Sequence, residues 1–362
     1  MTKEELFAIK IDKPDMTVYD ATKANFDALA KPIDGFGYIE DIICRIAAIH
    51  RNEKPDISGK ALVVMFSDNG VVKSGVSQIG KSVTLDVARL FSQGKSTVGV
   101  MTEGYPIELI GVDVGIDSDE KVPGIMDRKV SKGTGNIEEE SAMTEGECLQ
   151  AIKTGIEIAG ICRDKGIGLV VTGEMGIGNT TTATALLCAL TGEDPDLVTG
   201  RGAGLPDEGL TKKKAVIKHA LCLHGLDHYD AGKASPQYAF NALTCVGGLD
   251  IAALTGLFIG GGMYHIPVVI DGLISAVAAL TACDMIPGTV DYMIASHKGR
   301  EKGVKPALDR MHLHALIDAD MALGEGTGGV MITPIIDMVN NVYNSGTSFE
   351  SAQIRQYRRY EK

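Results

Sequence analysis

Two glutamates lie in glycine-rich stretches, where a carboxylate can reach a ligand. Glu174 stands in VTGEMGIGNTTT (residues 171–182), and Glu325 stands between two glycines in MALGEGTGGVMITP (residues 321–334). Glycine neighbours remove side chains that would shield a carboxylate, and a positioned glutamate can take a proton from an attacking group. We therefore take Glu174 and Glu325 as candidate catalytic residues. A glutamate on a surface turn is the alternative interpretation for Glu325.

The stretch around Glu174 also has the pattern of an anion-binding turn. Residues 169–171 are apolar and predict the end of a buried strand, glycines at 173, 176 and 178 predict a tight turn, and three threonines then open an apolar helix with a hydroxyl cap. Backbone N–H groups and the positive end of the helix dipole meet at such a turn. We expect a phosphate to bind there, at Gly176, Gly178, Asn179 and Thr180. A glycine turn that binds nothing is the alternative.

The spacing from Gly173 to Gly178 fits the first part of a P-loop, but Asn179 occupies the lysine position. Without that charge, the β- and γ-phosphates of a nucleoside triphosphate lose their main side-chain partner. The pattern therefore favours a monophosphate over a triphosphate.

Further candidates follow other glycines and predicted strand ends. Gly202 and Gly204 lie in GRGAGLPDEGLTKKKAVI (residues 200–217), where they allow a backbone to approach a ligand closely. The lysines at 212–214 have the pattern of a solvated helix face, which is the ordinary interpretation of such a charge run, and the nearby glycines add weight to the alternative that one of them turns inward. Ser77 follows the strand predicted at 60–66, and Ser296 follows a strand-like run at 292–295. Open α/β sheets bind ligands at the carboxyl ends of their strands.

Composition argues against several classes of partner. A net charge of −12 and a pI near 5.2 oppose binding to nucleic acid or to an anionic membrane. Seven scattered cysteines form no C-x-x-C pair, which indicates free thiols in a reducing compartment and no metal site. The first residues lack the basic and apolar regions of a signal peptide, so we expect a cytoplasmic protein. The apolar run at 251–280 is interrupted by His265, Pro267 and Asp271, which favours helix, turn and strand over a membrane span.

Strand and helix patterns alternate through most of the chain, which predicts an α/β fold. The first 57 residues look helical, with an isoleucine stripe at 39–49, and another helix is expected from Ile336 onward. Residues 116–145 are polar and glycine-rich, a composition typical of lids and disordered loops.

Five motifs in order carry a resemblance over nearly the whole chain. They are GEMGIGNTT (173–181), GRGAGLPDEGL (200–210), IPVVIDG (266–272), ASHKGREKG (295–303) and LGEGTGG (323–329). Together they resemble the nicotinate-nucleotide–dimethylbenzimidazole phosphoribosyltransferases. Members of this family make the α-ribazole phosphate of the cobamide nucleotide loop by moving phosphoribose from nicotinate mononucleotide to a benzimidazole.

The resemblance implies a mainly parallel, Rossmann-like sheet flanked by helices at 58–335, and a small helical domain built from 1–57 and 336–362. It implies a homodimer whose partners are nicotinate mononucleotide and an aromatic base, with no metal or other cofactor. Glu325 matches the general base, and Glu174 is similar to a second acid. Ser77 and Leu323 match the base pocket, and Lys213 matches the region around the phosphate.

The chain departs from the family pattern at Asn69, where a histidine is common, at Gly80, where a proline is common, and at Asp86, which stands in place of a base-pocket glutamine. These changes leave the acceptor open among a benzimidazole, a purine and a phenol. Two alternatives from other classes are a sensor that binds a nucleotide monophosphate without turnover and a P-loop-like NTPase relative.

Overall fold

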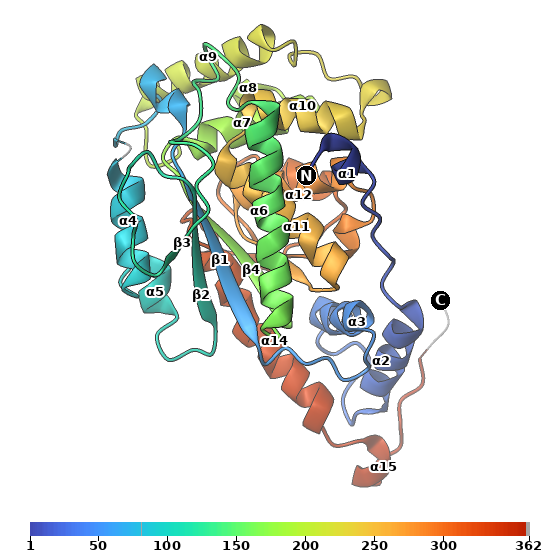
Figure 1. The fold of residues 1–362 in the computed structure, drawn as a ribbon. Coiled ribbons are helices and arrows are strands. Elements are labelled where there is room, and N and C mark those ends of the chain that lie inside the picture. Colours follow the sequence, from blue (N-terminus) through green and yellow to red (C-terminus); the bar gives the residue numbers. More distant parts are fainter. Residues whose placement is uncertain (81, 360–362) are drawn as a thin grey trace.

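Six parallel strands form the central sheet of the computed structural model, which describes residues 1–80 and 82–359 (Figure 1). They are β1 (Lys60–Ser67), β2 (Glu108–Gly115), β3 (Ile125–Asp127), β4 (Leu169–Met175), β5 (Val268–Ile270) and β6 (Met293–Ala295). Their order is β3-β2-β1-β4-β5-β6, and every neighbouring pair is parallel. This is the doubly wound order, whose direction reverses between β1 and β4. The predicted fold class is confirmed.

Both faces of the sheet are covered, so its central strands are apolar on both sides. In β1, Ala61, Val63 and Met65 belong to one hydrophobic core, and the alternate Leu62, Val64 and Phe66 belong to another. The first core packs beneath α6 (Glu145–Asp164), α7 (Asn179–Thr191), α10 (Pro236–Val246), α11 (Leu249–Tyr264) and α12 (Leu273–Met285). The second packs beneath α3 (Tyr38–His50), α4 (Ser82–Ser92), α5 (Thr97–Met101) and α14 (Thr327–Ser345).

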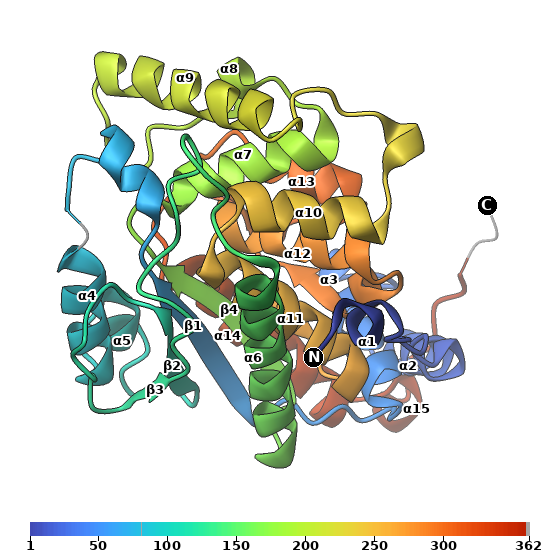
Figure 2. The same ribbon diagram turned by 45° about the horizontal axis from the view of Figure 1, so that its top comes forward.

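The remaining elements lie around this body. Figure 2 shows α8 (Pro195–Val198) and α9 (Asp207–Leu223) above α7, and α13 (Val304–Arg310) below it. Strands β7 (His297–Lys298) and β8 (Ile317–Asp318) form a separate parallel pair. The short helix α1 (Lys3–Phe7) packs on the main body, where Leu6 joins the first core.

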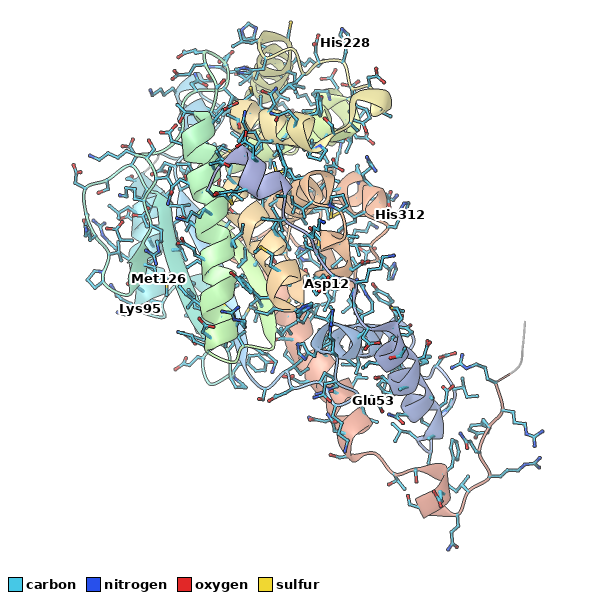
Figure 3. All side chains as sticks on the ribbon, turned by 45° about the vertical axis from the view of Figure 1, so that its right-hand side comes forward. Asp12, Glu53, Lys95, Met126, His228 and His312 are labelled. Atoms are coloured by element: carbon cyan, nitrogen blue, oxygen red, sulfur yellow. The ribbon has the colours of Figure 1, made fainter. Side chains whose placement is uncertain are left out.

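The two chain ends form a helical lobe with α2 (Met16–Ala28), α3 and α15 (Phe349–Ala352), which projects from the body in Figure 3. Leu29 pairs with Ser348 in an isolated bridge, and the rings of Phe26 and Tyr343 lie 4.7 Å apart. The Tyr343 hydroxyl donates to the backbone oxygen of Glu53, which Figure 3 labels. The N-terminal and C-terminal segments are thereby joined.

Three local expectations were wrong. The helix expected from Ile336 begins at Thr327, with Pro334 inside it, so α14 reaches from the lobe into the sheet layers. Gly173 and Glu174 belong to β4 and not to the turn after it. Helix α7 is capped by Gly178 and not by a threonine hydroxyl. Residues 116–145 join β2 to α6 and contain β3. In the described part of the chain, no helix combines the length and apolarity needed to cross a bilayer.

Helices α6 and α11 pack backbone against backbone because glycines face each other. A Cβ on Gly155 would lie 1.9 Å from the Ala253 carbonyl oxygen, and one on Gly256 would lie 1.9 Å from the Ile152 carbonyl oxygen. No side chain fits at either position without separating the helices.

We expect Gly155→Ala to destabilise the protein by about 1–3 kcal/mol, because the added methyl overpacks this contact. The matched control on the same helix is Gly146→Ala, where a Cβ meets nothing within 4 Å. That change should be neutral or stabilising by up to about 1 kcal/mol. Denaturant unfolding of the two variants measures the difference, and equal stabilities would contradict the close packing.

Candidate active site

A cavity of about 290 Å³ opens at the carboxyl ends of the strands. Its walls come from residues 76–79 after β1, 174–180 at the end of β4, 201–203 and 205 before α9, 271–274 after β5, and 322–325 and 327 before α14, together with His297 and Glu301. This is the edge at which doubly wound sheets bind ligands. Segments far apart in the sequence therefore meet at one pocket.

Nine of the twelve residues singled out from the sequence line this cavity. They are Ser77, Glu174, Gly176, Gly178, Asn179, Thr180, Gly202, Leu323 and Glu325. The other three lie just outside the wall. Lys213 contacts Thr180 from behind, Ser296 is buried beneath His297, and the Gly204 carbonyl oxygen accepts a hydrogen bond from Gln78 Nε2 at 2.7 Å.

The two candidate acids are brought together by a backbone contact. The Glu325 N–H donates to the Glu174 carbonyl oxygen at 3.2 Å. A Cβ on Gly173 would lie 2.9 Å from the Glu325 carbonyl carbon, and one on Gly324 would lie 2.8 Å from Glu174 Oε1. The absence of a side chain at Gly173 therefore allows the loop at 323–326 to pack against β4. The sequence pattern had instead indicated that Gly173 is part of a phosphate-binding turn.

Glu325 has an unusual backbone conformation. Its φ is +61°, in the left-handed region that non-glycine residues seldom adopt, and Gly326 follows at +82°. Glu325 Oε2 accepts a hydrogen bond from the Val98 N–H at 3.3 Å, so the carboxylate is directed toward the start of α5. Leu323 beside it is 51% exposed at the mouth of the cavity. Residues held in sparsely populated conformations cluster at functional sites.

Another part of the cavity wall suits an anion. Helix α7 is capped by Gly178, which has a φ of +95° and places no side chain over the first N–H groups. The buried ammonium group of Lys213 donates to Thr180 Oγ1 at 2.7 Å, and a Cβ on Gly202 would lie 2.9 Å from that same oxygen. Burial lowers the pKa of Lys213 to about 8, and the nearby Glu301 carboxyl group opposes that shift.

Several acidic groups at the cavity were not singled out from the sequence. Asp271 is buried at the end of β5, where Oδ1 accepts from the Gly329 N–H at 2.9 Å, and burial raises its pKa to about 7. Burial also raises the pKa of Glu301. For Glu174, which was singled out from the sequence, burial and the neighbouring Asp250 raise the pKa well above its ordinary value. The position of Asp271 directly after a predicted strand could have identified it as a site residue. Nothing in the sequence distinguished Glu301, because it lies in a charged loop.

His297 was interpreted from the sequence as a hydrogen-bonded structural residue. It is buried in the cavity wall, and its Nδ1 lies 2.9 Å from Ser296 Oγ. Burial lowers the pKa of His297, which favours the neutral ring.

The residues between 69 and 86 that differ from the family pattern do not all lie at the cavity. The Asp86 carboxylate forms an exposed ion pair with Arg89 at 2.6 Å and lies outside the cavity wall, so it does not replace a pocket glutamine. Gln78 lines the cavity instead. Asn69 is fully buried behind the turn at Gly176.

Comparison with known proteins agrees with a nucleotide-binding α/β transferase. The family model described as Phosphoribosyltransferase matches residues 11–354. Nicotinate-nucleotide–dimethylbenzimidazole phosphoribosyltransferase of Ruminiclostridium cellulolyticum is 40% identical over 100% of both chains, and that of Acetivibrio thermocellus is 39% identical over 93% of this chain and 94% of its own. The crystal structure of CobT from Thermus thermophilus has a TM-score of 0.87 and 33% identity, and the match covers 94% of this chain and 100% of CobT.

The chain therefore belongs to the nicotinate-nucleotide–dimethylbenzimidazole phosphoribosyltransferase family. The predicted family and enzyme class, a pentosyltransferase of cobamide nucleotide-loop synthesis, are confirmed.

Lys213 gives a test of the anion-binding end. Because its pKa is near 8, affinity for a phosphate monoester should fall as pH rises above about 8, where the ammonium group loses its proton. Lys213→Met should lower the affinity for nicotinate mononucleotide at pH 7 and flatten this dependence, whereas Lys214→Met, on the same helix, should leave both unchanged. Titration calorimetry from pH 6.5 to 9.5 measures the affinity for nicotinate mononucleotide and its pH dependence. A loss confined to acceptor affinity would contradict this placement of the phosphate.

Proposed function

We propose that this protein transfers the 5-phosphoribosyl group of nicotinate mononucleotide to a benzimidazole-type base, giving an α-ribazole phosphate and nicotinate. The observation that supports this most is that Glu325 and the start of α7 line one cavity. An acceptor beside Glu325 and a phosphate at α7 would place the ribose between them.

The reaction balances without an external acid. One ring nitrogen of the acceptor attacks C1 of the ribose as Glu325 takes the proton from the other ring nitrogen. The bond between C1 and the pyridinium nitrogen breaks, and its electron pair neutralises that nitrogen as nicotinate leaves. Attack from the face opposite the leaving group inverts C1. Positioning of the two substrates supplies much of the rate acceleration.

The acidic wall suits the charge that develops at C1. As the leaving bond lengthens, positive charge moves to the ribose, and fixed negative dipoles nearby stabilise it. Asp271 and Gly272 line the cavity after β5, which supports this role for the Asp271 carboxylate.

The proposed acceptor end lies at the mouth of the cavity, near Leu323, Ile79 and Ser77. Leu323 and Ile79 offer apolar contacts to an aromatic ring. The Ser77 hydroxyl already donates to the Ile79 carbonyl oxygen at 3.0 Å, so it holds the loop as well as facing the acceptor. A benzimidazole has the two ring nitrogens that the proton transfer to Glu325 requires.

We propose a cytoplasmic location, because the cysteines are free.

We also propose a homodimer formed through the exposed face of α14. Met331, Met338 and Val342 are exposed on one face of this helix, at spacings of seven and four residues. Sedimentation should give twice the 38.3 kDa chain mass, and Met338→Glu should favour the monomer. A wild-type monomer at micromolar concentration would overturn the proposal.

Glu325→Gln removes the proposed base and keeps the shape of the side chain. We expect kcat to fall by roughly 10²- to 10⁴-fold with little change in nucleotide affinity. Glu350→Gln, a matched change at an exposed glutamate in α15, should have no effect. Steady-state kinetics of nicotinate release decides the matter, and an unchanged kcat in Glu325→Gln would move the base assignment to Glu174.

The acceptor is tested with a panel of benzimidazoles, purines and phenols, each supplied with nicotinate mononucleotide, and with mass spectrometry of the products. We expect transfer to benzimidazoles. Tight nucleotide binding without turnover on any acceptor would instead favour a sensor, and magnesium-dependent release of phosphate from ATP would favour an NTPase relative.

A further inference from the structure

A buried polar cluster lies behind the cavity wall, and one of its members has no part in the chemistry above. The Asn179 side-chain amide donates to Glu174 Oε2 and, at 3.0 Å, to Asp250 Oδ2. Glu174 lines the cavity, whereas Asp250 is 0% exposed in the first turn of α11 and lies outside the wall. One amide group therefore joins a carboxyl group of the cavity to one in the interior.

The Asp250 carboxylate is held firmly in this position. Its Oδ1 accepts from the Ile251 N–H at 3.0 Å. A Cβ on Gly176 would lie 2.8 Å from Oδ2, and one on Gly248 would lie 2.5 Å from Oδ1, so two glycines make room for it. A carboxylate enclosed by protein is costly, and a first-turn acid gains the same helix-dipole stabilisation at an exposed position.

Two buried carboxyl groups that share one amide repel each other when both are ionised. Asp271 and Glu301 also face Glu174, and Asp68 faces Asp250. Two cations, Lys213 and Arg300, face Glu301, and Arg201 lines the cavity wall. Burial raises the pKa of Asp250 to about 6 and that of Glu174 well above its usual range. Asp250 also accepts the Ile251 N–H and lies in the first turn of α11, and both features stabilise its charged form. Of the two carboxyl groups, Asp250 is therefore the one that carries the negative charge.

We propose that Asp250 is a positioning residue that acts through Asn179 to hold the Glu174 carboxyl group neutral at the cavity wall. The Asn179 amide occupies Glu174 Oε2, so the proton resides on Oε1, the oxygen beside Gly324. Glu174 then presents an O–H donor, and not a second negative charge, to an anionic nucleotide next to Glu325. The inference rests on the proposed phosphoribosyl transfer at this cavity.

The test is the pH profile of kcat/KM for nicotinate mononucleotide in Asp250→Asn, which keeps the shape and removes the charge. Lys213 also contributes to the alkaline limb, so the profiles are compared in the wild-type and Lys213→Met backgrounds. Without the Asp250 charge Glu174 ionises at lower pH, so in both backgrounds the part of the limb that Glu174 sets should move down by about one unit, which is about a tenfold loss there. Activity at pH 6 should stay within about threefold of wild type. Asp284→Asn, at a half-buried acid of α12 outside the cavity, should leave the profile unchanged.

A double variant separates positioning from a merely structural role. Glu174→Gln carries a permanently uncharged amide, so adding Asp250→Asn to it should produce no further shift. An unshifted limb in Asp250→Asn, a uniform loss at all pH values, or the same shift in the Glu174→Gln background would overturn the proposal.

Two further measurements keep the outcomes distinct. If wild-type protein releases no nicotinate, the proposed function fails, and the pH dependence of nicotinate mononucleotide binding by calorimetry then tests the inference with the same variants. If Asp250→Asn does not fold, NMR of wild-type protein with ¹³C-carboxyl glutamate, assigned with Glu174→Gln, reads Glu174 directly. A neutral Glu174 at pH 7.5 supports the proposal, and one ionised at pH 6 contradicts it.

Discussion

The hydrogen bond from the Glu325 N–H to the Glu174 carbonyl oxygen is the contact on which the site depends. It joins the end of β4 to the loop before α14 and brings two acids, about 150 residues apart in sequence, to one cavity. It requires that no side chain stand at Gly173, where a Cβ would collide with the Glu325 backbone. The left-handed conformation of Glu325 lets the chain turn there and enter α14 at once. A glycine in a strand thus sets the position of the proposed catalytic acids through close backbone approach.

Electrostatics divides the cavity into two ends with different requirements. The molecule carries a net charge of −12, so an anionic nucleotide must be captured by local groups. In the proposed complex, the start of α7 and Lys213 capture the phosphate. Burial raises the pKa of Glu174 well above its ordinary value, so in that complex this carboxyl group repels the nucleotide less than a free carboxylate would. We infer that the burial that costs stability also makes the cavity compatible with the proposed ligand.

Local patterns were enough to predict much of this arrangement. The strand, glycine turn and helix around 169–190 were predicted because each depends on neighbouring residues. The charge run at 212–214 favoured a solvated face, and Lys213 was singled out through the family resemblance; the structure buries it. The role predicted for Gly173 was wrong. From the sequence alone, a glycine that forms part of a turn cannot be distinguished from one that makes room for a backbone segment far along the chain. The start of α14 was misplaced because the glycines at 326, 328 and 329 resemble a loop, yet they fit beneath the strand ends. Asp250 was missed because one acid in an apolar helix gives no sign of its partner across the fold.

A crystal structure of the protein with nicotinate mononucleotide tests the central claim most directly. The phosphate should lie within hydrogen-bond distance of the backbone N–H groups at residues 178–180 and of Lys213 Nζ, with C1 of the ribose between Glu174 and Glu325. A phosphate bound at the Leu323 end, or a ribose whose C1 faces away from Glu325, would contradict the account.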